Sequence, residues 1–167
     1  VLGDAGSGAW EWIIAGIIHA ADNGADVISM SLGAALEHSG YLDDNGTPNN
    51  PNDDFFVTAR EVQEQLVALS RATTYAYQAG AVVIASAGNS SVDADHTADL
   101  VHVPSDSAHV ISISASAPIG WATPIWDGSF DYLASYSNYG RSVIEFGAPG
   151  GDGAYPGNEN CLIAGLV

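Results

Sequence analysis

The sequence repeats one pattern twice: an amphipathic helix, then a glycine, then a short apolar strand. In the first copy, apolar residues recur at helical spacing over residues 10–21, Gly24 can end the helix in the left-handed conformation, and residues 27–30 are mostly apolar. In the second copy a similar stripe leads to Gly80 and to the apolar run 82–85. Helices that alternate with buried strands predict a parallel sheet covered by helices, with right-handed crossovers.

The rest of the chain predicts three further elements. The apolar run 110–115 is typical of another strand of the same sheet. Residues 132–136 and 143–146 are separated by the turn sequence 138–140, which predicts a β-hairpin. Residues 36–57 include many Asp, Asn, Gly and Pro, and we expect them to form a loop.

Composition limits the class of protein. The chain has 167 residues, of which 47% are hydrophobic and 14% charged, so it can bury one core. It has no apolar run long enough for a membrane span and does not begin with a signal-like segment. Its single cysteine, Cys161, cannot form an internal disulfide and would need a partner outside the chain.

The charge balance excludes two kinds of partner. Twenty acidic residues against three basic ones, with no lysine, give a formal net charge of −17. Such a chain repels the phosphates of nucleic acids and of anionic membranes, so we expect neither as a partner. The acidity suits a secreted, salt-tolerant or calcium-rich setting, and the simpler alternative is a solvated surface that keeps the protein soluble.

The first candidate site residue is Asn89, which follows the apolar run 81–85 and the residues Ser86, Ala87 and Gly88. This places an amide at the carboxyl end of a buried strand, which is where sites lie in open α/β sheets. A neutral amide can donate to an oxygen as negative charge develops on it. The alternative is that Asn89 is a turn residue that bonds to its own backbone.

Several motifs, taken in order, resemble those of the subtilases, the subtilisin-like serine proteases. They are the glycine-rich start at residues 3–8, Ser-Leu-Gly at 31–33, residues 79–89, Val-Pro at 103–104, residues 109–115, Ser-Tyr-Ser-Asn-Tyr-Gly at 135–140 and Ala-Pro-Gly at 148–150. The resemblance covers most of the chain outside the last dozen residues and residues 36–57. The latter depart from the family's compact form and would be an inserted acidic loop. It implies a three-layer α/β fold, with a mostly parallel sheet flanked by helices and incomplete at both ends, and the activity of a serine endopeptidase.

The resemblance also implies roles for particular residues. Asn89 would be the oxyanion-hole donor and therefore catalytic. Two backbone edges would pair with an extended polypeptide substrate, one formed by Gly6, Ser7 and Gly8 and the other by Ser31, Leu32 and Gly33.

Other residues of the resemblance would form subsites. Ser86, Ala87 and Gly88 would form one wall of the primary specificity pocket. Trp10 and Ile13 would lie near a more distant apolar subsite, and core packing is the alternative for both. His102 would lie at the bottom of the pocket, as a specificity residue or as an ordinary hydrogen-bonded histidine. The peptide bond before Pro104 matches a position that is cis in the family.

The family's triad motifs do not occur in the sequence. It contains no Asp-Thr-Gly-like, His-Gly-Thr-like or Gly-Thr-Ser-Met-Ala-like motif, and none of its five histidines has a His-Gly-Thr context. In the family the first two motifs precede the matched region and the third follows it. The sequence therefore predicts the central piece of a catalytic domain, inactive alone, whose partner is the remainder of the parent domain.

Two acidic clusters raise the question of calcium. Residues 43–54 are rich in oxygen ligands, but their spacing does not match an EF-hand loop. A second cluster contains Asp93, Asp95, His96 and Asp99. We expect no cofactor for catalysis and no catalytic metal. A structural calcium ion is possible at either cluster, and an ordinary polar loop is the alternative.

Three classes of function stay open on the sequence alone. The first is a serine endopeptidase, for which the family implies an extracellular location. The second is a subtilase-like domain without a triad that binds peptides. The third is a nucleotide-binding domain with a phosphate cradle at Gly3 to Gly8, but that glycine spacing fits neither phosphate-binding motif and the acidic charge would repel phosphate. An oxyanion donor at Asn89 favours the first class, because a binding module has no use for one.

Overall fold

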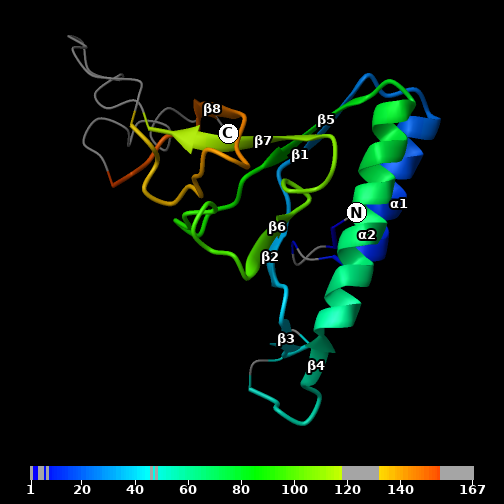
Figure 1. The fold of residues 1–167 in the computed structure, drawn as a ribbon, viewed down its shortest axis with the longest axis vertical. Coiled ribbons are helices and arrows are strands. Elements are labelled where there is room, and N and C mark those ends of the chain that lie inside the picture. The colour runs from blue at the N-terminus through cyan, green and yellow to red at the C-terminus, as the bar shows by residue number, and fades with distance from the viewer. Residues whose placement is uncertain are drawn as a thin grey trace.

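A four-stranded parallel sheet forms the centre of the molecule. The computed structural model describes residues 2–3, 6, 8–45, 47, 49–117 and 132–154. The strands lie in the order β1 (Val27–Met30), β5 (Val82–Ser86), β7 (Val110–Ser116) and β8 (Phe146–Pro149). Helices α1 (Trp10–Asp22) and α2 (Ala59–Gln78) run side by side against one face of this sheet (Figure 1). The predicted α/β class, with a parallel sheet flanked by helices, is confirmed, and the described ranges place helices on that face alone.

Both helices end as the glycine pattern predicts. Gly24 and Gly80 have φ angles of +75° and +100°, the left-handed region that lacks a steric penalty only for glycine. α2 also begins with a capping box that the sequence analysis missed: the Glu61 carboxylate accepts the Thr58 backbone N–H at 2.8 Å, while the Thr58 hydroxyl accepts the Glu61 N–H at 3.3 Å. In the part of the chain that is described, no helix has the length and apolar character that a bilayer span needs.

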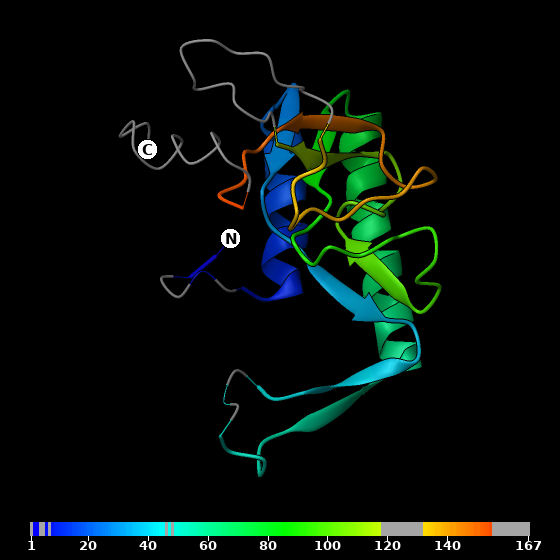
Figure 2. The same ribbon diagram turned by 90° about the vertical axis from the view of Figure 1, so that its left-hand side faces the viewer.

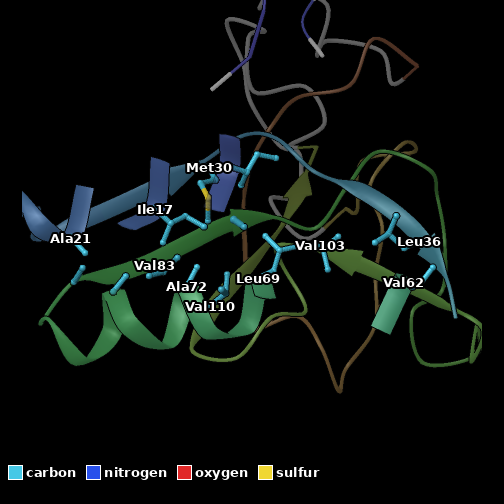
Figure 3. Packing of buried hydrophobic residues seen from close by; sticks show 14 of the residues in the cluster. Ile17, Ala21, Met30, Leu36, Val62, Leu69, Ala72, Val83, Val103 and Val110 are labelled. Atoms are coloured by element: carbon cyan, nitrogen blue, oxygen red, sulfur yellow. The ribbon is translucent and has the colours of Figure 1, made fainter. Parts of the chain in front are cut away.

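The core lies between the two helices and the sheet. Figure 3 shows Ile17 of α1, Leu69 of α2 and Val83 of β5 pointing into the same layer, and each is at most 2% exposed. Burial of one such side chain contributes roughly 1.5–3 kcal/mol. Both predicted helical stripes therefore face the sheet.

The stretch 36–57, which we expected to be a loop, contains regular structure. It includes a hairpin of β3 (Gly40–Asp43) and β4 (Phe55–Thr58), and β2 (Ala34–Glu37) pairs antiparallel with β6 (Leu100–Val103). Leu42 lies opposite Phe56, an apolar cross-strand pair that stabilises a hairpin. Most of the described turn formers that suggested a loop lie between the two strands. Figure 2 shows the hairpin projecting away from the rest of the molecule.

The predicted hairpin over residues 132–146 is wrong. β8 pairs in parallel with β7, and residues 132–144 form no extended ladder. The first residues of this stretch bond to the end of β7, where Ala134 N–H donates to the Ala115 carbonyl at 2.9 Å. Those around the turn bond to the loop after β5: Tyr139 N–H donates to the Val92 carbonyl at 3.0 Å, and Ala94 N–H donates to the Tyr139 carbonyl at 2.7 Å. Alternation and a turn sequence are local signals, and a partner more than forty residues away supplied the competing bonds.

Candidate active site

Two adjacent pockets lie where the parallel strands end. One encloses about 560 Å³ and the other about 280 Å³. Both are lined by Ser31, Ser86, Ala87, Gly88 and Asn89. The smaller pocket is closed on another side by Leu32 and Gly33. The structure thus brings together every candidate from the two motifs at 31–33 and 86–89, at the sheet edge that the topology predicts.

The side chain of Asn89 is available as a donor. The residue is exposed at the boundary of both pockets, and among the described residues its amide has no hydrogen-bond partner. The turn alternative, in which the amide bonds to nearby backbone, is therefore not what this part of the structure contains. The preceding Gly88 has a φ of +101°, so the chain turns sharply out of β5 just before the amide.

The backbone of residues 31–33 forms an open edge beside the pockets. No hydrogen bond joins the N–H or C=O groups of Ser31, Leu32 and Gly33 to any described residue. An extended peptide can pair with such an edge through its own main chain. Gly33 is also required structurally, because a Cβ on it would lie 2.5 Å from the Val103 carbonyl oxygen.

His102 closes the inner side of the smaller pocket. It is 6% exposed, and a ring nitrogen lies 3.2 Å from Nδ2 of Asn138. Its backbone N–H donates to the Asp106 carboxylate at 2.8 Å, and burial raises the pKa of that carboxyl group despite the bond. The hydrogen-bonded reading of His102 is thus the one observed. The Val103–Pro104 peptide bond is cis, as the resemblance implied.

The remaining predicted residues lie away from the two pockets. Ile13 is buried in the core and Trp10 packs against it, which supports the packing alternative for both. Gly6 has a φ of +76°, and neither it nor Gly8 lines either pocket. Ser7 falls outside the described residues, as does Cys161.

Sequence reasoning missed part of the pocket lining. Tyr136 and Ser137 face the larger pocket, together with residues 148–150 that follow β8. Gly150 lies so close that a Cβ on it would be 2.6 Å from the Tyr136 hydroxyl oxygen. These residues belong to the motifs at 135–140 and 148–150, for which the sequence alone predicts no role.

The described walls could bind and polarise a carbonyl group, but none of their serine hydroxyls hydrogen-bonds to a histidine side chain that could activate it for attack. In the described ranges no Asp, Glu, Lys or Arg lines either pocket, and His102, the histidine at the smaller one, bonds to Asn138. An amide and open backbone edges can hold an extended peptide and stabilise an oxyanion. A nucleophile that is activated by a general base would have to come from elsewhere.

In the acidic cluster after Asn89, Asp95 connects the loop after β5 to residues 141–142 by hydrogen bonds. The Asp95 carboxylate accepts from the Ser142 hydroxyl, from the Arg141 N–H at 2.7 Å and from the Ser142 N–H at 3.0 Å. These bonds, the Ser142 hydroxyl first, lower the pKa of Asp95 from 3.8 to about 2. The described residues contain no group of three or more His, Cys, Asp or Glu side chains arranged to hold a metal ion. A calcium site stays a prediction of the sequence.

Comparison with known proteins agrees with this architecture. The model of the subtilase family matches residues 1–165. Thermitase of Thermoactinomyces vulgaris is 31% identical over 90% of this chain, and the epidermin leader peptide-processing serine protease of Staphylococcus epidermidis is 28% identical over 84%. A solved lanthipeptide protease superimposes over 90% of the chain with a TM-score of 0.64 at 29% identity.

The matched region is only part of each relative. The chain spans 37% of thermitase, 28% of the epidermin-processing protease and 36% of the lanthipeptide protease. Within that region the family model covers nearly every residue, including the motifs that line both pockets. The chain belongs to the subtilase family.

Proposed function

We propose that this chain forms the oxyanion hole and much of the substrate cleft of a serine endopeptidase. The observation that carries the proposal is the position of Asn89, whose amide is exposed at the mouth of two pockets and unpaired among the described residues. One of the relatives, the epidermin leader peptide-processing enzyme, is named as a serine protease, which supports the same reaction. The serine, histidine and aspartate of the triad would be supplied by sequence outside residues 1–167.

The chemistry would be acyl transfer. A serine attacks the scissile carbonyl carbon, and the carbonyl oxygen becomes an oxyanion in the tetrahedral intermediate. An amide on Asn89 donates more strongly to that oxyanion than to the neutral carbonyl, which lowers the barrier. In subtilisin, a member of this family, loss of one such donor lowers kcat about a hundred- to thousandfold.

The substrate would be a polypeptide bound in an extended conformation. Its main chain would pair with the open edge at residues 31–33, and one side chain would enter the pocket of about 280 Å³. The relative named as a leader peptide-processing protease supports a polypeptide substrate. Catalysis would need no cofactor, and we place the protein outside the cell, as the family implies.

A second candidate is a domain that binds peptides without cutting them. The absence of acidic and basic groups from the described pocket walls is consistent with this reading. Asn89 argues against it, because binding alone does not require a donor directed at a developing charge.

The first experiment is to sequence the reading frame on both sides of residues 1–167. Asp-Thr-Gly-like and His-Gly-Thr-like motifs upstream, with Gly-Thr-Ser-Met-Ala downstream, would identify an active parent. In that parent, Asn89→Ala should lower kcat on a fluorogenic peptide about a hundredfold or more, while a fluorophosphonate should still label the serine. A frame without the triad motifs would overturn the peptidase and favour the binding domain.

A further inference from the structure

The loop that follows β5 is held by one side chain from a distant segment. Asn138 is 1% exposed, and its Oδ1 accepts the N–H groups of Ser90 and Val92, both at 3.0 Å. Its Nδ2 donates to the Ala87 carbonyl at 2.7 Å. The backbone N–H of Asn138 donates to the Gly88 carbonyl at 3.0 Å. One residue therefore bonds to the chain both before and after Asn89.

The orientation of the Asn138 amide is fixed by its partners. Oδ1 faces two N–H donors and Nδ2 faces a carbonyl oxygen, so the reverse orientation would put donor against donor and acceptor against acceptor. The ring of His102 lies on the Nδ2 side, with a nitrogen at 3.2 Å. A neutral imidazole nitrogen can accept there, which adds a third constraint on the same amide.

Gly88 leaves the space that the Asn138 side chain occupies. A Cβ on Gly88 would lie 2.5 Å from Nδ2 of Asn138 and 3.4 Å from the His102 ring. The amide thus packs directly against the backbone of the residue before Asn89. None of the described contacts of Asn138 is to Asn89 itself, which lines both pockets.

We propose that Asn138 is the positioning residue of the oxyanion hole: by bonding the backbone on both sides of Asn89 it fixes where the Asn89 amide points. This inference rests on the proposed function of Asn89 as the donor. A donor stabilises an oxyanion without reorganisation only if it is already in place, and a displacement of about 1 Å can cost about a hundredfold in rate. Asn138 would meet this requirement without touching substrate.

A double-mutant cycle in the full-length gene product tests the inference. The proteins compared are wild type, Asn89→Ala, Asn138→Ala and the double variant, each measured for kcat and for melting temperature. We expect Asn138→Ala alone to lower kcat about ten- to hundredfold. In the Asn89→Ala background the same change should lower kcat by no more than about twofold, because the donor it positions is gone.

Two further variants separate positioning from loss of stability. Thr73→Ala removes a hydroxyl that is 0% exposed and bonds within α2, so it should lower the melting temperature and leave kcat unchanged. Asn138→Ser keeps a polar group and the backbone bond to Gly88, and it replaces Asn138→Ala in the cycle if the alanine variant does not fold.

The outcomes are distinct. If Asn89→Ala lowers kcat but the change at residue 138 costs the same factor with and without Asn89, the positioning role is wrong and the proposed function stands. If Asn89→Ala leaves kcat unchanged, both the positioning role of Asn138 and the proposed function of Asn89 are wrong. A loss of kcat at residue 138 that disappears in the Asn89→Ala background, with equal losses of melting temperature in both backgrounds, supports the inference.

Discussion

Two structural features at position 88 favour glycine. Its φ of +101° is a conformation that residues with a Cβ rarely adopt, and the amide of Asn138 fills the position of the missing side chain. Either requirement alone would favour glycine. Together they restrict this position in the wall of the two pockets to glycine.

We expect Gly88→Ala to lower both stability and kcat. The backbone strain costs about 1–3 kcal/mol, and the clash with Asn138 displaces the loop that carries Asn89. The matched control is Gly24→Ala, which has a similar φ of +75° and no described atom within 4 Å of the added Cβ. Thermal melts and kcat of the full-length protein distinguish them: Gly24→Ala should lose stability only. Equal kcat in the two variants would contradict the argument.

Local sequence revealed Asn89 but not Asn138, and the reason is physical. Asn89 ends an apolar run, so its place at a strand end follows from neighbouring residues. The role of Asn138 depends on partners 46 to 51 residues away, and no local periodicity encodes a contact at that separation. The motif at 135–140 was recognised, but its turn-forming residues were read as a hairpin turn.

At the scale of elements, the sequence predicted those with a strong local pattern. Both helices and the strands β1, β5 and β7 followed from periodicity and from glycine ends. The hairpin of β3 and β4 was missed because acidic turn residues at its tip outweighed two short apolar segments. The hairpin predicted at 132–146 is the opposite error. The turn sequence is present, but the residues of the turn form their hydrogen bonds with the loop at 88–95.

The hydrogen bonds that Asp95 accepts from Arg141 and Ser142 should make the stability of the protein depend on pH. The pKa of Asp95 falls from 3.8 to about 2 on folding, so its carboxylate contributes stability that is fully present above pH 3.8 and is lost as the pH falls through about 2. We expect Asp95→Asn to lower the denaturation midpoint of the full-length protein near neutral pH. The gap from wild type should close between about pH 4 and pH 2.

The control for this prediction is Asp26→Asn, a change at an exposed acidic residue in the turn before β1. It removes the same charge without removing the bonds to Arg141 and Ser142. A gap of equal size in the two variants would mean that net charge, rather than the loop contact, sets the pH dependence.

At the scale of the whole molecule, the helices cover one face of the sheet, and the described residues leave the other face uncovered. Val27 and Val82 lie opposite each other on the face away from the helices, at 57% and 44% exposed, and Phe146 of β8 is 62% exposed. The described residues provide no layer over this face. Exposed apolar surface of this kind marks a place where further structure packs.

We expect residues 1–167, expressed alone, to be poorly stable. The protein should melt over a broad range without a cooperative transition and should bind a hydrophobic dye, because the uncovered face and the edge of β1 are open to solvent. The full-length protein provides the comparison. A sharp melt of the isolated piece, comparable to an intact domain of this size, would refute the expectation.

The strand order has a consequence for biosynthesis. Along the sheet, β1, β5, β7 and β8 follow the same order as along the chain, so each strand leaves the ribosome after the neighbour on which it docks. Asn138 comes 48 residues after Ser90. During translation the loop after β5, with Asn89 in it, is therefore synthesised before the residue that holds its backbone by hydrogen bonds.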